Sequence, residues 1–162
     1  MADAVPIRKT SSILDEMLEM QDSIMRRAYE IFEQNGSTLG RDLENWAQAE
    51  RELLWRPPFE LCEKDGKFQL EAAIAGLEAK DITVEVTPED IMLKADLQHE
   101  HKEQKGIVHY CEFQPGKMFR TIHLPKKIDT ERVKAEFKNG LLRLTAEVAQ
   151  EARARTIKPE AA

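Results

Sequence analysis

The residues best suited to chemistry in this sequence are histidines that lie close to a cysteine: His99, His101, His109 and Cys111. Imidazole nitrogen and thiolate sulfur are preferred ligands of zinc, so the group raises the question of a metal site. Its spacing matches no closed tetrahedral pattern, and His99 and His101 fall in a polar stretch typical of a long loop. Solvated loop histidines are the favoured interpretation, and a weak opportunistic metal site is the alternative.

Enzymatic signatures are missing from the sequence. It contains no Gly-rich phosphate loop, no nucleophile elbow and no zinc-protease helix. We therefore expect a protein that is not an enzyme, has no cofactor and does not hydrolyse ATP. Cys62 and Cys111 are expected to be reduced thiols on strands, with a redox switch as the less favoured alternative.

Charge and hydropathy exclude two classes of partner. The 162 residues carry a net charge of −6. By our count, residues 1–58 contribute −4, residues 59–149 contribute −3 and the rest +1. No segment is strongly basic, so neither nucleic acid nor an anionic membrane is a favoured partner. No apolar run approaches the roughly 20 residues of a membrane span, and no signal-peptide pattern is visible, which predicts a cytoplasmic protein.

The elements that position these residues change in type near Pro57-Pro58. Before this point apolar residues recur at steps of three and four, which predicts a helix that Ser11 or Ser12 caps and Asn35-Gly36 ends. A second helix over about 41–54 completes a helical hairpin. The first helix carries the candidate residues for client binding and oligomerisation: Ile13, Leu14, Met17, Leu18, Ile24, Met25, Ile31 and Phe32.

After the two prolines the hydrophobic pattern alternates with a period of two, with turns every 8–12 residues. Asn139-Gly140 is the strongest short hairpin signal. No helix separates the strands, so we predict a mainly β protein: an immunoglobulin-like antiparallel β-sandwich preceded by the hairpin. The expected divisions are a helical region over 1–56, a sandwich domain over 57–149 and a flexible tail over 150–162.

Three motifs resemble the α-crystallin domain of small heat shock proteins of the bacterial and plant type, and their order and spacing along the chain strengthen the resemblance. They are Ala135-x-x-x-Asn139-Gly140-x-Leu142; Gly116-x-x-x-Arg120-x-Ile122-x-Leu124-Pro125, with Glu112 before it; and Ala75-Gly76-Leu77 followed by Lys80-Asp81-Ile82-x-Val84-x-Val86. The resemblance covers about 59–148. Residues from about Ile24 to Leu54 resemble a different family, a small bacterial helix-pair domain of unknown function.

The resemblance implies a dimer of sandwiches. A short strand at about 107–111 would leave its own subunit and pair with the partner's strand near 59–63, which covers an edge that invites aggregation. Arg120 would lie at this interface and need a carboxylate such as Glu112 or one from the second subunit; an exposed arginine on an edge is the alternative. The expected interface residues are Glu112, Arg120, Ile107, Tyr110, Phe59 and Leu61.

The resemblance also implies a groove that receives the C-terminal tail of a neighbouring subunit. Its walls would be Ile82, Val84, Val86, Val133, Ala135 and Phe137. The family's tail carries two β-branched apolar residues two positions apart, whereas this chain offers Ile157 alone. Burying one side chain in the groove where the family buries two loses roughly 1.5–3 kcal/mol of binding free energy. We therefore expect oligomers to depend on the N-terminal helices.

The stripe on the first helix allows two interpretations. It is either the core of the hairpin or an adaptable apolar surface for unfolded chains, and both hold if the stripe is wider than its partner can cover. The function we expect is an ATP-independent holdase that binds unfolding client proteins as a homo-oligomer built from dimers. The alternative is a non-catalytic scaffold or co-chaperone adaptor that recruits one partner through the helices.

Overall fold

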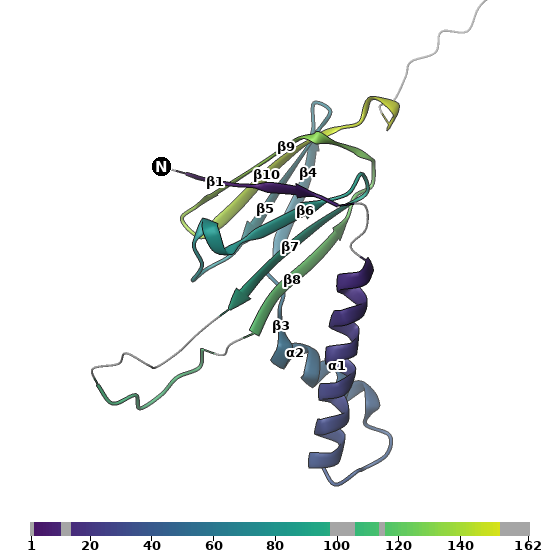
Figure 1. Ribbon diagram of the computed structural model, residues 1–162, viewed down its shortest axis with the longest axis vertical. Helices are drawn as coiled ribbons and strands as arrows, with labels where there is room; N and C mark the ends of the chain where they lie inside the picture. Colours follow the sequence, from purple (N-terminus) through teal and green to yellow (C-terminus); the bar gives the residue numbers. More distant parts are fainter. Residues whose placement is uncertain (1, 11–13, 98–105, 114–115, 153–162) are drawn as a thin grey trace, which may run out of the picture.

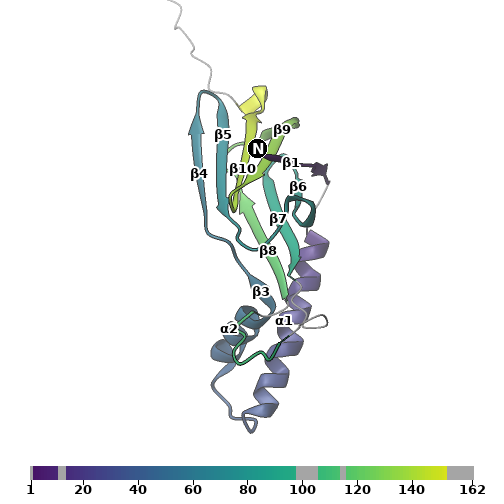
Figure 2. The same cartoon turned by 90° about the vertical axis from the view of Figure 1, so that its left-hand side faces the viewer.

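The computed structural model describes residues 2–10, 14–97, 106–113 and 116–152. Two β-sheets face each other in a sandwich, and a pair of helices extends from one end of it (Figure 1). A view turned by 90° shows the first helix running alongside one sheet and past its end (Figure 2). The predicted fold class, an antiparallel sandwich with an N-terminal helical hairpin, is confirmed.

Each sheet has five strands. The first has the order β1-β9-β10-β5-β4 and is antiparallel throughout; its strands are β1 (Asp3–Val5), β9 (Ile128–Lys138), β10 (Leu141–Val148), β5 (Lys67–Ala73) and β4 (Phe59–Lys64). The second has the order β2-β6-β7-β8-β3; its strands are β2 (Ile7–Lys9), β6 (Thr83–Val86), β7 (Asp90–Leu97), β8 (Gly116–His123) and β3 (Leu54–Trp55). The pairs β2–β6 and β3–β8 are parallel, so this sheet is mixed.

The core follows the alternation seen in the sequence. In β5 every second residue is buried, and Leu70 faces Leu144 of β10 across the ladder. Inward side chains from both sheets form one cluster, which is the main source of stability for such a fold. Its fully buried large members are Phe68, Leu70, Ile74, Val84, Ile91, Leu93, Met118, Ile128, Leu142 and Leu144.

Asn139-Gly140 forms the tight hairpin that its sequence predicts. Asn139 has φ = 53° and Gly140 has φ = 77°, the left-handed values of a type I′ turn. The Gly140 carbonyl accepts a hydrogen bond from the Ile74 backbone N–H at 2.7 Å. The turn therefore connects β9 to β10 and also ties the end of β5 to them.

The helices are α1 (Leu14–Gln34) and α2 (Asp42–Leu53). Gly36, with φ = 76°, ends the first helix as expected. The predicted caps Ser11 and Ser12 lie outside the described residues. Two short 3-10 turns, η1 (Ala79–Asp81) and η2 (Gln150–Ala152), complete the elements.

The N-terminal region differs from the expected helical segment over 1–56. Residues 3–9 form β1 and β2, which pair with strands of the sandwich, and Leu54–Trp55 form β3 beside β8. Strands of two or three residues are too short to show a periodicity of their own, and their partners lie some 60–130 residues away in sequence. The remaining domain boundaries stay a prediction.

Leu144→Ala should lower the free energy of unfolding by about 2–5 kcal/mol, because it opens a cavity opposite Leu70 in a fully buried layer. The shift in the urea midpoint measures the loss. Thr145→Ala, at an exposed position of the same strand, should change it by no more than about 0.5 kcal/mol. Equal shifts in the two variants would contradict the assignment of this face to the core.

Candidate interaction surfaces

The apolar stripe of α1 is only partly covered by α2. Ile24 and Ile31 are buried against Ala49 and Leu54, with Trp46 packed at the side. These two isoleucines were expected among the client-binding residues. They instead form the core of the hairpin, because a helix of this length needs a partner for at least part of its apolar face.

The other part of the stripe faces outward. Leu14, Leu18, Met25 and Tyr29 have exposed fractions of 57, 52, 55 and 61%. Steps of four and seven residues place them on one side of the helix, and we call this set the exposed ridge. Met17 and Phe32 are half-buried, and the Phe32 ring lies 6.0 Å from that of Tyr29. Ile13 lies outside the described residues.

An ion pair holds the two helices together beside this core. Arg27 of α1 contacts Glu52 of α2 at 2.6 Å and Glu30 of its own helix at 2.9 Å. Its hydrogen bond lowers the pKa of the Glu52 carboxyl, and Gln48 adds a second one at 3.0 Å. The hairpin is thus fixed by charge at its surface and by apolar packing within.

The hairpin is joined to the sandwich at β7 and β8. Lys94 of β7 bridges Glu16 of α1 at 2.7 Å and the nearly buried Glu85 at 2.9 Å. Burial lowers the pKa of Lys94, but its hydrogen bonds to the two carboxylates raise it by more, so the net pKa lies above its usual value. Phe119 of β8 also packs on the helical core.

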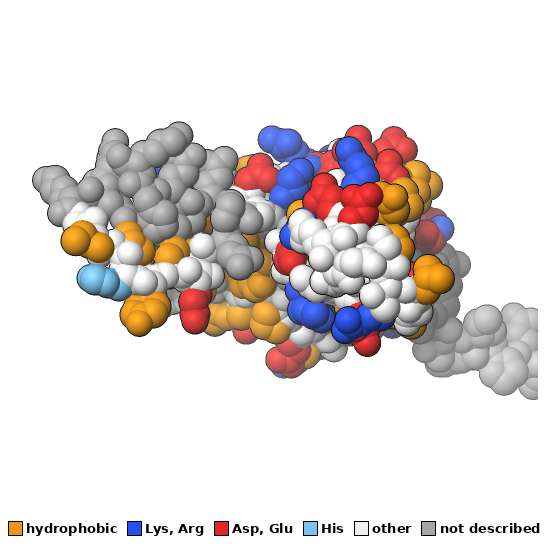
Figure 3. Space-filling model, turned by 90° about the horizontal axis from the view of Figure 1, so that it is seen from below, with side chains coloured by type: hydrophobic (Ala, Val, Ile, Leu, Met, Phe, Trp, Pro, Cys, Tyr) orange, Lys and Arg blue, Asp and Glu red, His pale blue; other side chains and the backbone are white. Residues whose placement is uncertain are grey.

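A second apolar surface lies on the segment 106–113, which projects from the sandwich away from the helices (Figure 1). Ile107 and Tyr110 are 85 and 95% exposed, and Val108 and Phe113 are exposed as well. Seen from below, hydrophobic side chains gather on this projecting segment (Figure 3). A single subunit leaves them in water, which is the usual mark of an interface.

The edge strand β4 is the sandwich surface that the segment was expected to meet. Within the described residues β4 pairs only with β5, so its other edge is open. Phe59 and Leu61 are half-buried on its inner side. The Arg120 guanidinium stacks over the Phe59 ring, with its carbon 4.6 Å from the centroid. The arginine thus meets an aromatic face where a carboxylate was expected.

Glu112 does not reach Arg120 within one subunit. Its side chain is exposed on the projecting segment, and no ion pair of Arg120 is found in the described part of the chain. The dimer-interface residues therefore fall into two groups. Phe59, Leu61 and Arg120 meet at the β4 edge, whereas Ile107, Tyr110 and Glu112 lie on the segment that leaves it.

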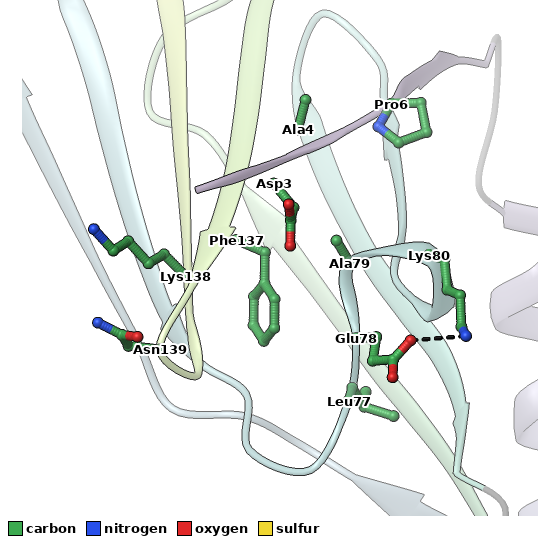
Figure 4. A pocket seen from close by; sticks show the side chains of 10 residues that line it. All are labelled: Asp3, Ala4, Pro6, Leu77, Glu78, Ala79, Lys80, Phe137, Lys138 and Asn139. Carbon is green, nitrogen blue, oxygen red and sulfur yellow. Dashed lines mark ion pairs between the residues drawn. The ribbon is translucent and has the colours of Figure 1, made fainter. Parts of the chain in front are cut away.

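The residues predicted to line a tail-docking groove lie on facing strands of the two sheets, and residues 3–9 lie beside them (Figure 4). Ile82, Val84 and Val86 form one wall, with Val133, Ala135 and Phe137 opposite. β1 pairs with β9 along one wall and β2 with β6 along the other. Val5 between them is only 3% exposed. The predicted anchor Ile157 lies outside the described residues.

The histidine and cysteine group does not form a metal site within the described residues. Across the described residues no three His, Cys, Asp or Glu side chains are placed to hold a metal ion. His109 and Cys111 are exposed, and His99 and His101 lie outside the described residues.

On β4, a hydrogen bond to Glu60 raises the pKa of the exposed Cys62 thiol, which makes it a poorer nucleophile. Neither described helix is long and apolar enough to cross a bilayer.

Comparison with known families assigns both parts of the chain. Residues 60–159 match the Hsp20/alpha crystallin family, and residues 19–54 match a protein family of unknown function, DUF2934. The first match covers more than half of the chain. The protein therefore belongs to the Hsp20/alpha crystallin family, the small heat shock proteins, which are non-catalytic chaperones.

Relatives and solved structures agree with this assignment. A probable 15 kDa heat shock protein of Leptospira interrogans is 28% identical over 59% of this chain and 72% of its own length. Small heat shock protein C2 of Rickettsia felis is 27% identical over 62% and 66%. The structure of heat shock protein 16.0 from Schizosaccharomyces pombe matches the fold with a TM-score of 0.54, at 23% identity, over 66% of this chain and 99% of that one.

Glu52→Gln should lower the melting temperature of the helical hairpin at pH 7, because it removes the charged partner of Arg27. The Arg27 hydrogen bond holds the folded-state pKa of Glu52 below the ordinary value of 4.5 for a glutamate, so this contribution is present above pH 4.5 and is lost as the pH falls through the folded pKa. The difference in melting between wild type and variant, followed by circular dichroism at 222 nm, should vanish in acid. A difference of the same size at both ends of the pH range would contradict this role.

Proposed function

We propose that this protein is an ATP-independent holdase that binds unfolding proteins and suppresses their aggregation. The exposed ridge on α1 is the observation that carries the proposal. A helix that has already buried Ile24 and Ile31 still presents three large aliphatic side chains and a tyrosine to water. Membership of a family of non-catalytic chaperones supports the same conclusion.

The chemistry of the ridge suits clients of varied sequence. Leu and Met side chains offer apolar area without directional demands, and Met25 adapts to irregular partners through its flexible thioether chain. Unfolded chains expose the same kind of surface and associate with one another, and the rate of this association rises steeply with their concentration. A ridge that binds one chain competes with that step, while the net charge of −6 keeps the complex in solution.

We also propose that the working unit is a dimer that associates further through the helical hairpins. The projecting segment carries Ile107 and Tyr110 with almost no cover, and β4 presents an open edge. Pairing the segment of one subunit with β4 of the other covers both at once. The carboxylate of Glu112 would then arrive near Arg120 from the partner, where the single subunit supplies only the Phe59 ring.

A scaffold that recruits one specific partner through the hairpin is the second candidate. One observation favours it: Leu39 and Leu43 are exposed at the tip of the hairpin, away from the ridge. The residues 19–54 that match a family of unknown function also span the tip and much of α1. A scaffold would depend on the tip, whereas a holdase depends on the ridge.

We place this activity in the cytoplasm as part of the proposal. Cys62 and Cys111 are both free and exposed, which suits a reducing compartment.

Leu18→Ser/Met25→Ser should reduce protection of a heat-labile client several-fold, because it removes the middle of the ridge without touching the buried Ile24 and Ile31. Light scattering of the client at 1:1 subunits without ATP measures the effect. Glu19→Ser/Arg26→Ser is the matched control, with two exposed polar neighbours changed and the net charge unchanged.

A wild-type protein that leaves client scattering unchanged would contradict the holdase proposal. A ridge variant that protects as well as wild type, while Leu39→Ser/Leu43→Ser at the hairpin tip loses all protection, would contradict the assignment of client binding to the ridge and would move it to the tip.

Ile107→Ser/Tyr110→Ser should shift the native mass toward the monomer, because the segment loses the apolar contacts that hold it on the partner's β4. Both side chains are almost fully exposed in one subunit, so the fold of each sandwich should be unaffected. Leu39→Ser/Leu43→Ser changes as many exposed apolar residues elsewhere and should leave the dimer intact. A dimer that persists in the first variant would refute the proposed exchange.

A further inference from the structure

The outer face of β4 carries a thiol and a carboxylate side by side. Glu60 and Cys62 lie two residues apart on the strand, so both point away from the core, and both are exposed. The Cys62 Sγ donates a hydrogen bond to Glu60 Oε1 at 3.2 Å. With Zn–S and Zn–O bonds of about 2.3 and 2.1 Å, two such ligands of a tetrahedral zinc ion lie about 3.6 Å apart. The pair therefore has the composition and nearly the spacing of half a zinc site.

The projecting segment carries a second pair of metal-ligand side chains, His109 and Cys111. They are also two residues apart and exposed, and an extended strand places such residues on one face. In one subunit the Cys111 thiol donates a weak hydrogen bond to the Phe113 carbonyl oxygen at 3.7 Å. A single subunit does not bring the two pairs together, since no three ligand side chains converge within its described residues.

The proposed dimer determines which face of the segment meets which face of β4. Phe59 is half-buried on the inner side of β4 and lies under the Arg120 guanidinium. Bringing the partner's segment in so that Glu112 approaches Arg120 puts Glu112 on this inner side, and an antiparallel pairing with Glu112 opposite Phe59 does so. Because side chains alternate along a strand, His109 and Cys111 then lie on the outer side.

This register brings the two pairs of ligands together on the outer face. His109 falls opposite Cys62, and Cys111 falls opposite Glu60. Opposing residues of an antiparallel pair have Cβ atoms about 4.5–5.5 Å apart, so the four side chains can converge on one ion. Two sulfurs, one imidazole nitrogen and one carboxylate oxygen form a donor set that favours zinc in tetrahedral coordination.

We propose that each exchanged strand of the dimer completes a zinc site, with His109 and Cys111 from one subunit and Glu60 and Cys62 from the other. The site rests on the dimer proposed above and adds a metal ion that fastens the segment to β4. Two-fold symmetry gives two equivalent sites per dimer. Zinc takes the place of the proton shared by Cys62 and Glu60, and both thiols bind as thiolates. Since only the dimer contains the whole site, zinc stabilises the dimer over the monomer.

Mixed dimers test whether two subunits share the site. A His109→Asn/Cys111→Ser subunit keeps only the β4 pair, and a Glu60→Gln/Cys62→Ser subunit keeps only the segment pair. Native mass spectrometry under a phosphine reductant should find no zinc in either variant alone. A mixed dimer, purified through two different tags that lack histidine, should hold one zinc ion, and the wild-type dimer should hold two. Zinc retained by either variant alone, or a mixed dimer without zinc, would overturn the proposal.

Zinc affinity tests the ligands one at a time. In competition with a chromogenic chelator, Cys62→Ser should raise the Kd for zinc at least about 10-fold, because even partners behind the ligands commonly contribute 10–100-fold. His123→Asn, which changes an exposed histidine on β8, is the control and should bind zinc as wild type does. The cobalt-loaded wild type should show a thiolate-to-cobalt charge-transfer band that weakens in Cys62→Ser. Equal Kd values for wild type and Cys62→Ser would contradict the site.

The native mass of the same samples separates the zinc site from the dimer itself. Removing zinc with EDTA should shift wild type toward the monomer and leave the distribution of Cys62→Ser unchanged. A wild-type dimer that binds no zinc would refute the site while the proposed dimer stands. A wild type that stays monomeric with and without zinc would refute both. All four ligand side chains are exposed in one subunit, so the variants should keep the wild-type fold, which circular dichroism checks.

Discussion

A sandwich of two sheets must cover the unpaired backbone groups of its edge strands, and this constraint organises the whole chain. Each sheet has two edges, and uncovered edges invite association with any other strand. β9 and β6 are covered by the short strands β1 and β2, and β8 is partly covered by β3, so the edges formed by these strands have only two or three residues. β4, with six residues, is the longest edge strand among the described residues, and its outer side is open. In the dimer that we propose, the projecting segment of the second subunit, with Ile107 and Tyr110, covers it.

The exposed ridge has two causes: α2 is shorter than α1, and it lies on only one side of α1. α1 has 21 residues and α2 has 12, which correspond to lengths of about 32 and 18 Å. The shorter helix buries Ile24 and Ile31 but leaves Leu18 and Met25 in water. The first turns of α1 are held at the sandwich by Glu16 and Lys94 instead. One helix can thus supply the core of the hairpin and an apolar surface at the same time.

Local patterns in the sequence were enough to predict most of the sandwich. Alternation identified the buried faces of β5, β7 and β10, and Asn139-Gly140 identified its turn, because each of these depends on neighbours in the chain. β1 and β2 could not be found in this way. Asp3-Ala-Val and Ile7-Arg-Lys show no periodicity, and Val5 is buried because β1 pairs with the distant β9 and places Val5 in the core of the sandwich. The apolar-x-apolar spacing of Val5 and Ile7 was the one available signal.

The division of the α1 stripe could not be predicted from helical spacing alone. Ile24 and Met25 are consecutive residues of the same stripe, yet one is buried and the other exposed, because α2 lies on one side only. The partner of Arg120 could not be predicted from the sequence either, because Phe59 contacts it only when β4 and β8 face each other.

Site-specific photo-crosslinking tests the central claim most directly. A benzophenone side chain at Met25 on the ridge, compared with one at Thr145 on the outer face of the sandwich, reports where a thermally unfolding client contacts the chaperone. The account predicts abundant client adducts from position 25 and few from position 145. Adducts mainly from position 145, or none from position 25 while aggregation is suppressed, would contradict it.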